Sequence, residues 1–425
     1  MLNLELQYSF DGIDLQNVVV ATYFMEIDRG DDIVFRARKV ASLIYPGAWT
    51  DTAGYDLEAS KKHAARILGI YETPPYEIEL PADSSRRRFI VQLAIPLIDI
   101  EWSVASLLTS VAGEILAYSN LKLLDLYLPR SFVEHFKGPK FGVEGLRKLL
   151  GVYGRPLLLA IIKPSQGYSP AEGAASFFDA ASGGVDIVKD EELLSDPSYC
   201  KRVKRVELYR QAEKRAFEET GEHTLYAVNI TDRVDRLLPN ALEALEAGAN
   251  ALMVNYMAIG LEATQMLCED SRVTVPILGH NSGVTSIHAS THTGMSSLLI
   301  NGKLPRLCGV DLGIALSGLG SFPVLPERLL LLVRDMLSPF HNIPPTLPII
   351  ANGVTPGRVA GLLRTYGNDI ALGAGSAIFG HPQGASAGGR AFRQAITCCL
   401  EGRDLDSTLG EYQELSAAVK LWGNS

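Results

Sequence analysis

The stretch LLLAIIKPSQGYSPAEGAASFFDAASGGVDIVKDEE, residues 157–192, decides the fold. It opens with an apolar run at 157–162, continues through a segment with helical character, and closes with a second apolar run at 185–188. Continuous apolar runs separated by a helix are typical of neighbouring parallel strands, which are buried on both faces. The stretch therefore predicts a strand, a helix and a second strand parallel to the first.

The same unit repeats along the rest of the chain. Six further apolar runs follow, each succeeded by a helical segment of about 10 to 15 residues. Eight parallel strands that alternate with helices predict a closed (β/α)8 TIM barrel in the α/β class. The eight runs are 157–162, 185–188, 224–230, 251–255, 275–279, 308–316, 347–351 and 369–373.

The first third of the chain has a different pattern, because its strands and helices do not alternate regularly. Such a mixture predicts an α+β domain, here ferredoxin-like, that precedes the barrel. We place this domain at residues 1–138 and the barrel, with C-terminal helices, at 139–425. The predicted elements are strands at 17–27, 75–80, 88–96 and 121–128 and helices at 31–44 and 102–117.

Composition narrows the possible partners and locations. The formal net charge of −9 argues against nucleic acid or an anionic membrane as a partner. No apolar run approaches the roughly 18 residues that a membrane span needs. The first residues lack the basic region and apolar run of a secretory signal, so we expect a cytoplasmic protein.

Polar residues follow the predicted strands at the end where TIM barrels carry their chemistry. Lys163 follows the first strand, and Lys189 ends the second, directly before Glu191 and Glu192. A partly desolvated lysine has a lowered pKa, and carboxylate oxygens suit Mg2+. Two lysines beside one divalent ion can polarise a carbonyl and move a proton. Ion pairs at the barrel rim explain the same residues about equally well.

Two small-residue turns and one histidine complete the set. The glycine-rich turn with Gly375 and Ser376 follows the last strand and opens a helix, where backbone N–H groups favour an anion. The turn with Asn352 and Gly353 follows the seventh strand. Both indicate a phosphate site, or tight turns that need glycine for backbone reasons. His280 ends the fifth strand. It is either a general acid or base, or a buried residue that satisfies a hydrogen bond.

The order of these motifs resembles the RuBisCO large-subunit superfamily, and specifically its non-carboxylating RuBisCO-like (form IV) branch. The match is collinear and nearly full-length. It runs from Gly47-Ala-Trp49-Thr50, through Gly183-Gly-x-Asp-x-x-Lys189-Asp-Glu-Glu, to Gly380-His-Pro-x-Gly384. The central segment, placed after a Lys-Pro strand end, is a highly specific combination.

The resemblance implies a Mg2+ ion held by Glu191, Glu192 and the carbamate that CO2 forms on Lys189, with Lys163 near the enolising carbon. The family motif usually has aspartate where this chain has Glu191. The resemblance also implies a small phosphorylated substrate and a homodimer, or an assembly of dimers, with the active site at the interface. The expected phosphate- and substrate-binding residues are Asn229, Ser317, Asn352, Gly353, Gly375 and Ser376.

Departures from the family pattern argue against carboxylation. The loop after the sixth strand, LSGLGS at 316–321, lacks the lysine of carboxylases. Ser165 replaces a second lysine, Asn281 an arginine, and Leu43 a glutamate. Because these losses remove positive charge from one end of the site, we expect a substrate with one phosphate and a less charged opposite end.

Glu114 is the most informative departure. Its position holds asparagine in carboxylases and lysine in the diketo-methylthiopentyl-phosphate enolases. The family dimer brings this residue into the partner's barrel mouth, where a carboxylate can act as general base or relay a proton. The alternative is an ordinary glutamate on a surface helix.

Together these residues predict a Mg2+-dependent lyase or isomerase that acts on a sugar phosphate. Decarboxylation of a 3-keto acid and enolisation or isomerisation of a ketose give the same kind of enolate, stabilised in the same way. The alternative enzymes are a methionine-salvage enolase, which the missing enolase lysine disfavours, and a methylthioribulose-phosphate isomerase. A catalytically silent scaffold that binds a phosphate ligand is the alternative from another class.

Overall fold

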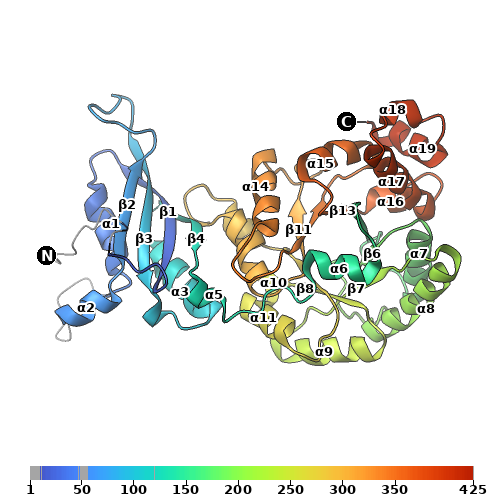
Figure 1. The fold of residues 1–425 in the computed structure, drawn as a ribbon, viewed down its shortest axis with the longest axis horizontal. Helices are drawn as coiled ribbons and strands as arrows, with labels where there is room; N and C mark the ends of the chain where they lie inside the picture. Colours follow the sequence, from blue (N-terminus) through green and yellow to red (C-terminus); the bar gives the residue numbers. More distant parts are fainter. Residues whose placement is uncertain (1–9, 11, 46, 48–55, 119, 425) are drawn as a thin grey trace. The chain divides into compact units, whose positions relative to one another are not determined.

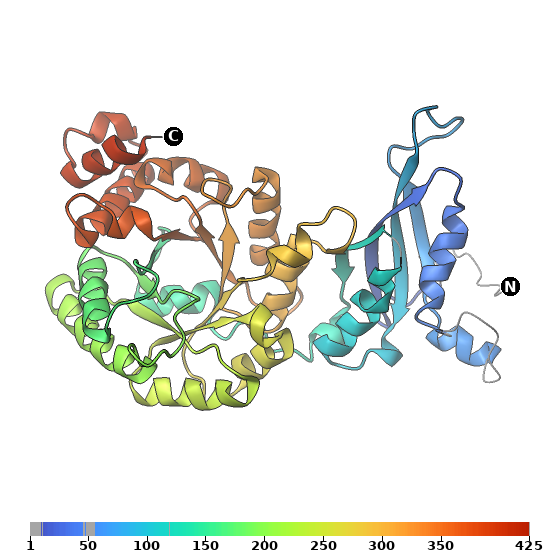
Figure 2. The ribbon, with the colours of Figure 1, turned by 180° about the vertical axis from the view of Figure 1, so that it is seen from behind.

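The computed structural model describes residues 10, 12–45, 47, 56–118 and 120–424 (Figures 1 and 2). Trp49 and Thr50 of the sequence motif lie outside these residues. The chain divides into two compact units. The N-terminal unit consists of residues 1–136 and 283–300, and the barrel unit of 137–282 and 301–425.

The N-terminal unit is built on a five-stranded sheet in the order β10-β4-β1-β3-β2. Strands β4, β1, β3 and β2 pair antiparallel, and with α1 and α3 they give the β-α-β-β-α-β order of a ferredoxin-like fold, as expected. Its elements are β1 (Val18–Asp28), α1 (Ile33–Ser42), α2 (Leu57–His63), β2 (Arg66–Glu72), β3 (Arg86–Pro96), α3 (Val104–Ala112), α4 (Glu114–Ala117), β4 (Asn120–Tyr127), α5 (Arg130–Val133), α12 (Thr285–His288) and β10 (Gly294–Met295).

Two of the elements predicted for this unit are wrong. No strand forms at 75–80; β3 pairs with β1 on one side and on the other with β2, which lies earlier in the chain than 75–80. The helix expected at 102–117 is interrupted at Gly113, which separates α3 from α4. A side chain at Gly113 would place its Cβ 2.4 Å from the carbonyl oxygen of Thr109, so the close approach requires glycine.

The barrel unit confirms the eight predicted strands. They close in the order β11-β12-β13-β5-β6-β7-β8-β9, and every neighbouring pair is parallel. Apolar side chains from these strands fill the interior. The strands are β5 (Leu157–Ile161), β6 (Ile187–Lys189), β7 (Leu225–Asn229), β8 (Ala251–Asn255), β9 (Ile277–His280), β11 (Leu312–Leu316), β12 (Leu347–Ala351) and β13 (Ala371–Ala374).

Helices surround these strands, as Figures 1 and 2 show for α7, α8 and α9. Within the described residues, no helix combines the length and the apolar character that crossing a membrane requires. The helices of the barrel unit are α6 (Gly142–Leu150), α7 (Pro170–Ser182), α8 (Arg202–Thr220), α9 (Val234–Glu246), α10 (Tyr256–Ile259), α11 (Leu261–Glu269), α13 (Leu304–Leu307), α14 (Pro326–Leu337), α15 (Val359–Tyr366), α16 (Ser376–Phe379), α17 (Ala385–Leu400), α18 (Leu405–Thr408) and α19 (Gln413–Trp422).

Candidate active site

The first lysine–carboxylate pair joins the ends of two neighbouring strands. Lys163, just after β5, places its Nζ 3.2 Å from Oε1 of Glu191, which follows β6. The same Nζ donates to Oγ of Ser165 at 3.0 Å. A Cβ at Gly375 would lie 3.1 Å from Cε of Lys163, so the glycine lets the lysine lie against the turn after β13. Residues from three predicted strand ends therefore meet here.

The second pair is more deeply buried. Lys189 is 1% exposed, and its Nζ donates to the carbonyl oxygen of Asp190 at 2.8 Å. Oε2 of Glu192 lies 3.6 Å from the same Nζ. Burial lowers the pKa of Lys189, although the neighbouring carboxylates act in the opposite direction. The consequence is a larger share of the uncharged, nucleophilic amine than an exposed lysine has.

His280 completes this second group. Its Nε2 lies 3.3 Å from Oε2 of Glu192, and its Nδ1 accepts the N–H of Ser282 at 3.2 Å. Burial, reinforced by the charge of Lys189, lowers the pKa of His280 to about 3. Burial alone would raise the pKa of Glu192, but His280 and Lys189 lower it. The imidazole is therefore neutral at pH 7, and its Nε2 lies beside the Glu192 carboxylate.

A buried network fixes the main chain that carries these residues. The Asp190 carboxylate accepts hydrogen bonds from the Arg205 guanidinium at 2.9 Å and the Tyr226 hydroxyl at 2.7 Å. It also accepts the backbone N–H of Asn229 at 3.0 Å. Asp190 and Arg205 are both fully buried. Because every partner is itself buried, the segment from Lys189 to Glu192 has little freedom to move.

Two asparagines hold the same segment from the neighbouring strands. Nδ2 of Asn229, at the end of β7, donates to the carbonyl oxygen of Glu192 at 3.0 Å, and its Oδ1 accepts the N–H of Thr231 at 3.0 Å. Nδ2 of Asn255, at the end of β8, donates to the same Glu192 oxygen at 3.1 Å. Asn229, predicted to bind substrate, thus has both ends of its amide engaged within the protein.

The turns after β11 and β12 are tied to each other. The hydroxyl of the buried Ser317 donates to the carbonyl oxygen of Asn352, whose Nδ2 donates to the carbonyl oxygens of Ser317 at 2.8 Å and Phe322 at 3.1 Å. Gly353 has a φ of +85°, and a Cβ there would lie 2.5 Å from the backbone nitrogen of Gly320. The glycine is therefore needed for conformation and for close packing.

Ser376 and Glu114 are the remaining predicted site residues. Ser376 begins α16, a helix of four residues directly after Gly375. Glu114 begins α4 in the N-terminal unit, and its side chain is exposed. The barrel unit thus brings Lys163, Lys189 and the two glutamates to one mouth, whereas Glu114 belongs to the other unit.

Sequence reasoning assigned no role to three residues that shape the site. Asn255 was visible as a polar residue at a strand end, which is the signal that identified Lys163. Arg205 lies on α8 and Tyr226 near the start of β7, and neither position has a local pattern that separates it from other buried polar residues.

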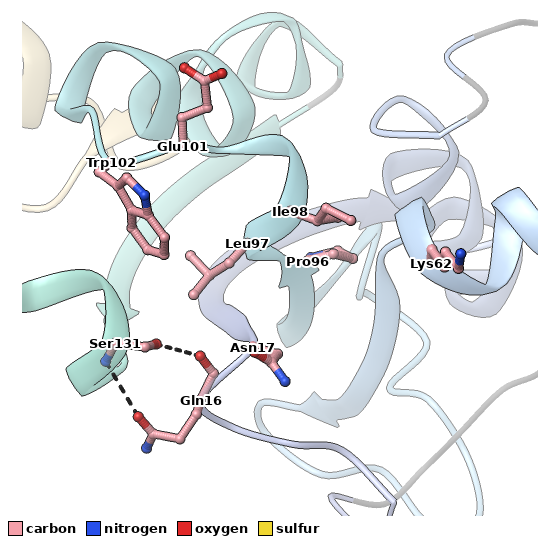
Figure 3. A pocket seen from close by; sticks show the side chains of 9 residues that line it. All are labelled: Gln16, Asn17, Lys62, Pro96, Leu97, Ile98, Glu101, Trp102 and Ser131. Carbon is pink, nitrogen blue, oxygen red and sulfur yellow. Dashed lines mark hydrogen bonds between the residues drawn. The ribbon is translucent and has the colours of Figure 1, made fainter.

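A separate hollow lies in the N-terminal unit (Figure 3). It has a volume of about 520 Å³ and is lined by Gln16, Asn17, Lys62, Pro96, Leu97, Ile98, Glu101, Trp102 and Ser131. None of these residues belongs to the predicted site, so the hollow gives no support to the expected chemistry.

Comparison with known proteins identifies the family. Two domain models match: "Ribulose bisphosphate carboxylase large chain, N-terminal domain" at residues 5–132, and the catalytic domain of the same chain at 142–321 and 335–422. A ribulose bisphosphate carboxylase-like protein of Archaeoglobus fulgidus is 41% identical over 97% of this chain and 95% of its own length. A 2,3-diketo-5-methylthiopentyl-1-phosphate enolase of Bacillus licheniformis is 36% identical over 95% and 98%.

Solved structures agree with this assignment. The dimeric archaeal Rubisco of Hyperthermus butylicus superimposes with a TM-score of 0.89 and 26% identity, covering both chains completely. The likeness therefore extends over both units. The chain belongs to the RuBisCO large-chain family and, within it, to the RuBisCO-like (form IV) proteins.

Proposed function

We propose that this protein is a Mg2+-dependent enzyme that forms an enolate from a small phosphorylated sugar derivative and does not fix CO2. The observation that carries the proposal is the pair of lysine–glutamate contacts, Lys163–Glu191 and Lys189–Glu192, at the ends of the adjacent strands β5 and β6. Relatives named as enolases and as RuBisCO-like proteins support the enolate chemistry.

The residues fit a Mg2+ site. Among the described residues, no group of three or more histidine, cysteine, aspartate or glutamate side chains gathers to hold a metal. Glu191 and Glu192 offer two carboxylates, and a carbamate on Lys189 would supply the third. The lowered pKa of Lys189 favours the free amine, which forms an N–C bond with CO2 and releases one proton. Bound Mg2+ would polarise the substrate carbonyl.

Lys163 is the residue that we assign to proton transfer. Its side chain is 35% exposed, so the amine can reach substrate at the mouth while Glu191 and Ser165 orient it. The neutral His280 lies 3.3 Å from the Glu192 carboxylate and is a poor base at pH 7, because its pKa is about 3.

The substrate that fits this mouth has one phosphate. The turns that contain Gly353, Gly375 and Ser376 are its proposed binding site. The loop after β11 has no lysine or arginine from Ser317 to Glu327. Since a second phosphate would lack charged donors there, carboxylation of a bisphosphate is disfavoured.

The proposed active form is a homodimer. Glu114 is exposed in its own chain, as a residue that serves a partner's site must be. The structural neighbour from Hyperthermus butylicus, of 26% identity, is a dimeric Rubisco. In the dimer, Glu114 would be a general base or proton relay at the partner's barrel mouth.

The test follows solvent deuterium exchange and CO2 release on a panel of phosphorylated ketoses and 3-keto sugar acids, with Mg2+ and bicarbonate. Lys163→Ala should lower the rate about a thousandfold, and the exposed Lys148→Ala is the matched control. Exchange without CO2 release would identify an enolase or isomerase, and CO2 release a decarboxylase. Neither signal, with Mg2+ bound, would overturn the proposal in favour of a silent scaffold.

A further inference from the structure

Asn255 is a polar residue at the barrel mouth whose role is not accounted for by the lysines and glutamates. It ends β8 and lies in register beside His280 of β9. Its backbone N–H donates to Oγ1 of Thr231 at 3.0 Å, and its Nδ2 donates to the carbonyl oxygen of Glu192 at 3.1 Å. The residue is only 8% exposed.

The other end of this amide has no partner. Oδ1 of Asn255 is buried and makes no hydrogen bond with any residue that the structure describes. Turning the amide over would bring Oδ1 against the carbonyl oxygen of Glu192, so the Nδ2 contact fixes its orientation. A buried carbonyl oxygen without a donor is costly, and native structures rarely retain one without a reason.

The neighbourhood indicates what this oxygen binds. Glu192, whose main chain Asn255 holds, pairs through its carboxylate with Lys189 and His280. Neutral amide oxygens are suitable partners for a hard cation and its bound waters. Residues that orient metal ligands from behind typically contribute ten- to a hundredfold to metal affinity.

We propose that Asn255 belongs to the cation centre: its Nδ2 positions Glu192, and its Oδ1 supplies a neutral oxygen to Mg2+ and its water shell. This inference rests on the proposed function, because it concerns the same cation. It adds a residue of β8 to a site whose proposed metal ligands lie at the end of β6 and directly after it.

Calorimetric titration of the full-length protein with Mg2+, in bicarbonate buffer, tests the inference without any substrate. The nearly isosteric Asn255→Leu should weaken Mg2+ binding about tenfold. Asn255→Asp keeps an oxygen at the Oδ1 position, and its added negative charge should offset the lost Nδ2 donor, so it should bind Mg2+ at least as tightly as the wild type. If Asn255 only held the main chain, the aspartate variant would bind as weakly as the leucine variant, because it also loses the Nδ2 donor.

Asn250, just before the same strand, provides the matched control. Its Oδ1 accepts the N–H of Tyr226 at 2.7 Å, and its Nδ2 donates to the carbonyl oxygen of Thr224 at 3.1 Å. Asn250→Ala should therefore lower stability and leave Mg2+ affinity unchanged.

The outcomes separate this inference from the proposed function. If the wild type binds Mg2+ and Asn255→Leu binds equally well, only the inference is overturned. If the wild type binds no Mg2+, both are overturned. If Asn255→Leu does not fold, weaker binding by Asn255→Asp than by the wild type is the result that overturns the inference.

Discussion

The two ends of the barrel use charged residues in different ways. At the end where the strands begin, the Arg155 guanidinium makes two hydrogen bonds of 2.7 Å to the buried Asp186 carboxylate. At the mouth, the lysine–glutamate distances are 3.2 Å for Lys163–Glu191 and 3.6 Å for Lys189–Glu192. A guanidinium matches a carboxylate with two parallel bonds, whereas an ammonium is a point charge that can exchange partners.

Hydrogen bonding shows the same contrast. Before β11, the buried Asp311 accepts three backbone N–H groups, from Phe141 at 2.6 Å and from Gly142 and Ile277 at 2.9 Å. At the mouth, Oδ1 of Asn255 has no partner within the described residues. At the end where the strands begin, the Asp311 carboxylate is thus held by donors of the chain itself, which stabilise the fold. At the mouth, the buried acceptor oxygen of Asn255 remains available to a ligand, as is expected of a binding site.

The largest effect on stability is expected from replacing Asp311, at the end of the barrel where the strands begin. Asp311→Asn replaces an oxygen that accepts N–H groups with an NH2 group that cannot accept, so we expect a loss of about 3 kcal/mol in the free energy of unfolding. Urea denaturation measures it, with the exposed Asp179→Asn as control. A loss below about 1 kcal/mol would contradict the importance of the three contacts.

The second effect concerns the mouth and depends on pH. Burial lowers the pKa of His280 to about 3, against about 6.5 in the unfolded chain. As pH falls from 7 to 5, the unfolded chain takes up a proton there and the folded chain does not, so stability falls. The metal-free protein should lose about 2 kcal/mol from this residue over that range.

His280→Gln keeps a polar side chain and removes the titration. Urea denaturation at pH 7 and at pH 5, with EDTA present, should therefore show a flatter pH dependence for the variant than for the wild type. Parallel pH profiles for the two proteins would mean that His280 takes up its proton equally in both states, and the neutral imidazole assigned at the mouth would be wrong.

The barrel was predictable from sequence, whereas part of the N-terminal sheet was not. Strands buried on both faces read as uninterrupted apolar runs, which identified all eight. In the N-terminal unit, 75–80 alternates like a strand but lies between prolines, and β2 contains Gly69 where its register with β3 shifts. The pairing of β10 with β4 involves only two residues of a distant segment, and such contacts leave no local pattern.

The candidate site was predictable as a set of residues but not as a set of contacts. Strand ends identified Lys163, Lys189 and the two glutamates. Which lysine faces which glutamate depends on side-chain directions at the ends of β5 and β6, and periodicity does not determine these. Arg205 approaches Asp190 from a helix, so only the folded chain reveals the network that fixes the mouth.

The smallest effect should come from a matched pair of methionine substitutions, one at each end of the barrel. Lys189→Met removes a buried amine whose pKa burial already lowers, and methionine fills a similar volume. The carboxylate left behind, Glu192, is 24% exposed and keeps His280 at 3.3 Å, so no charge is left fully buried and alone, and the metal-free variant should stay within about 1 kcal/mol of the wild type. Turnover should nevertheless be lost, because the proposed cation site loses its carbamate.

Arg155→Met makes the same kind of change at the end of the barrel where the strands begin. It leaves Asp186 buried, with Arg393 at 3.8 Å as a remaining cation, so a loss of about 2 kcal/mol is expected. Urea denaturation of both variants compares the two ends directly. If Lys189→Met costs as much stability as Arg155→Met, the charges at the mouth hold the fold together as those at the other end do, and the division between a structural end and a binding end fails.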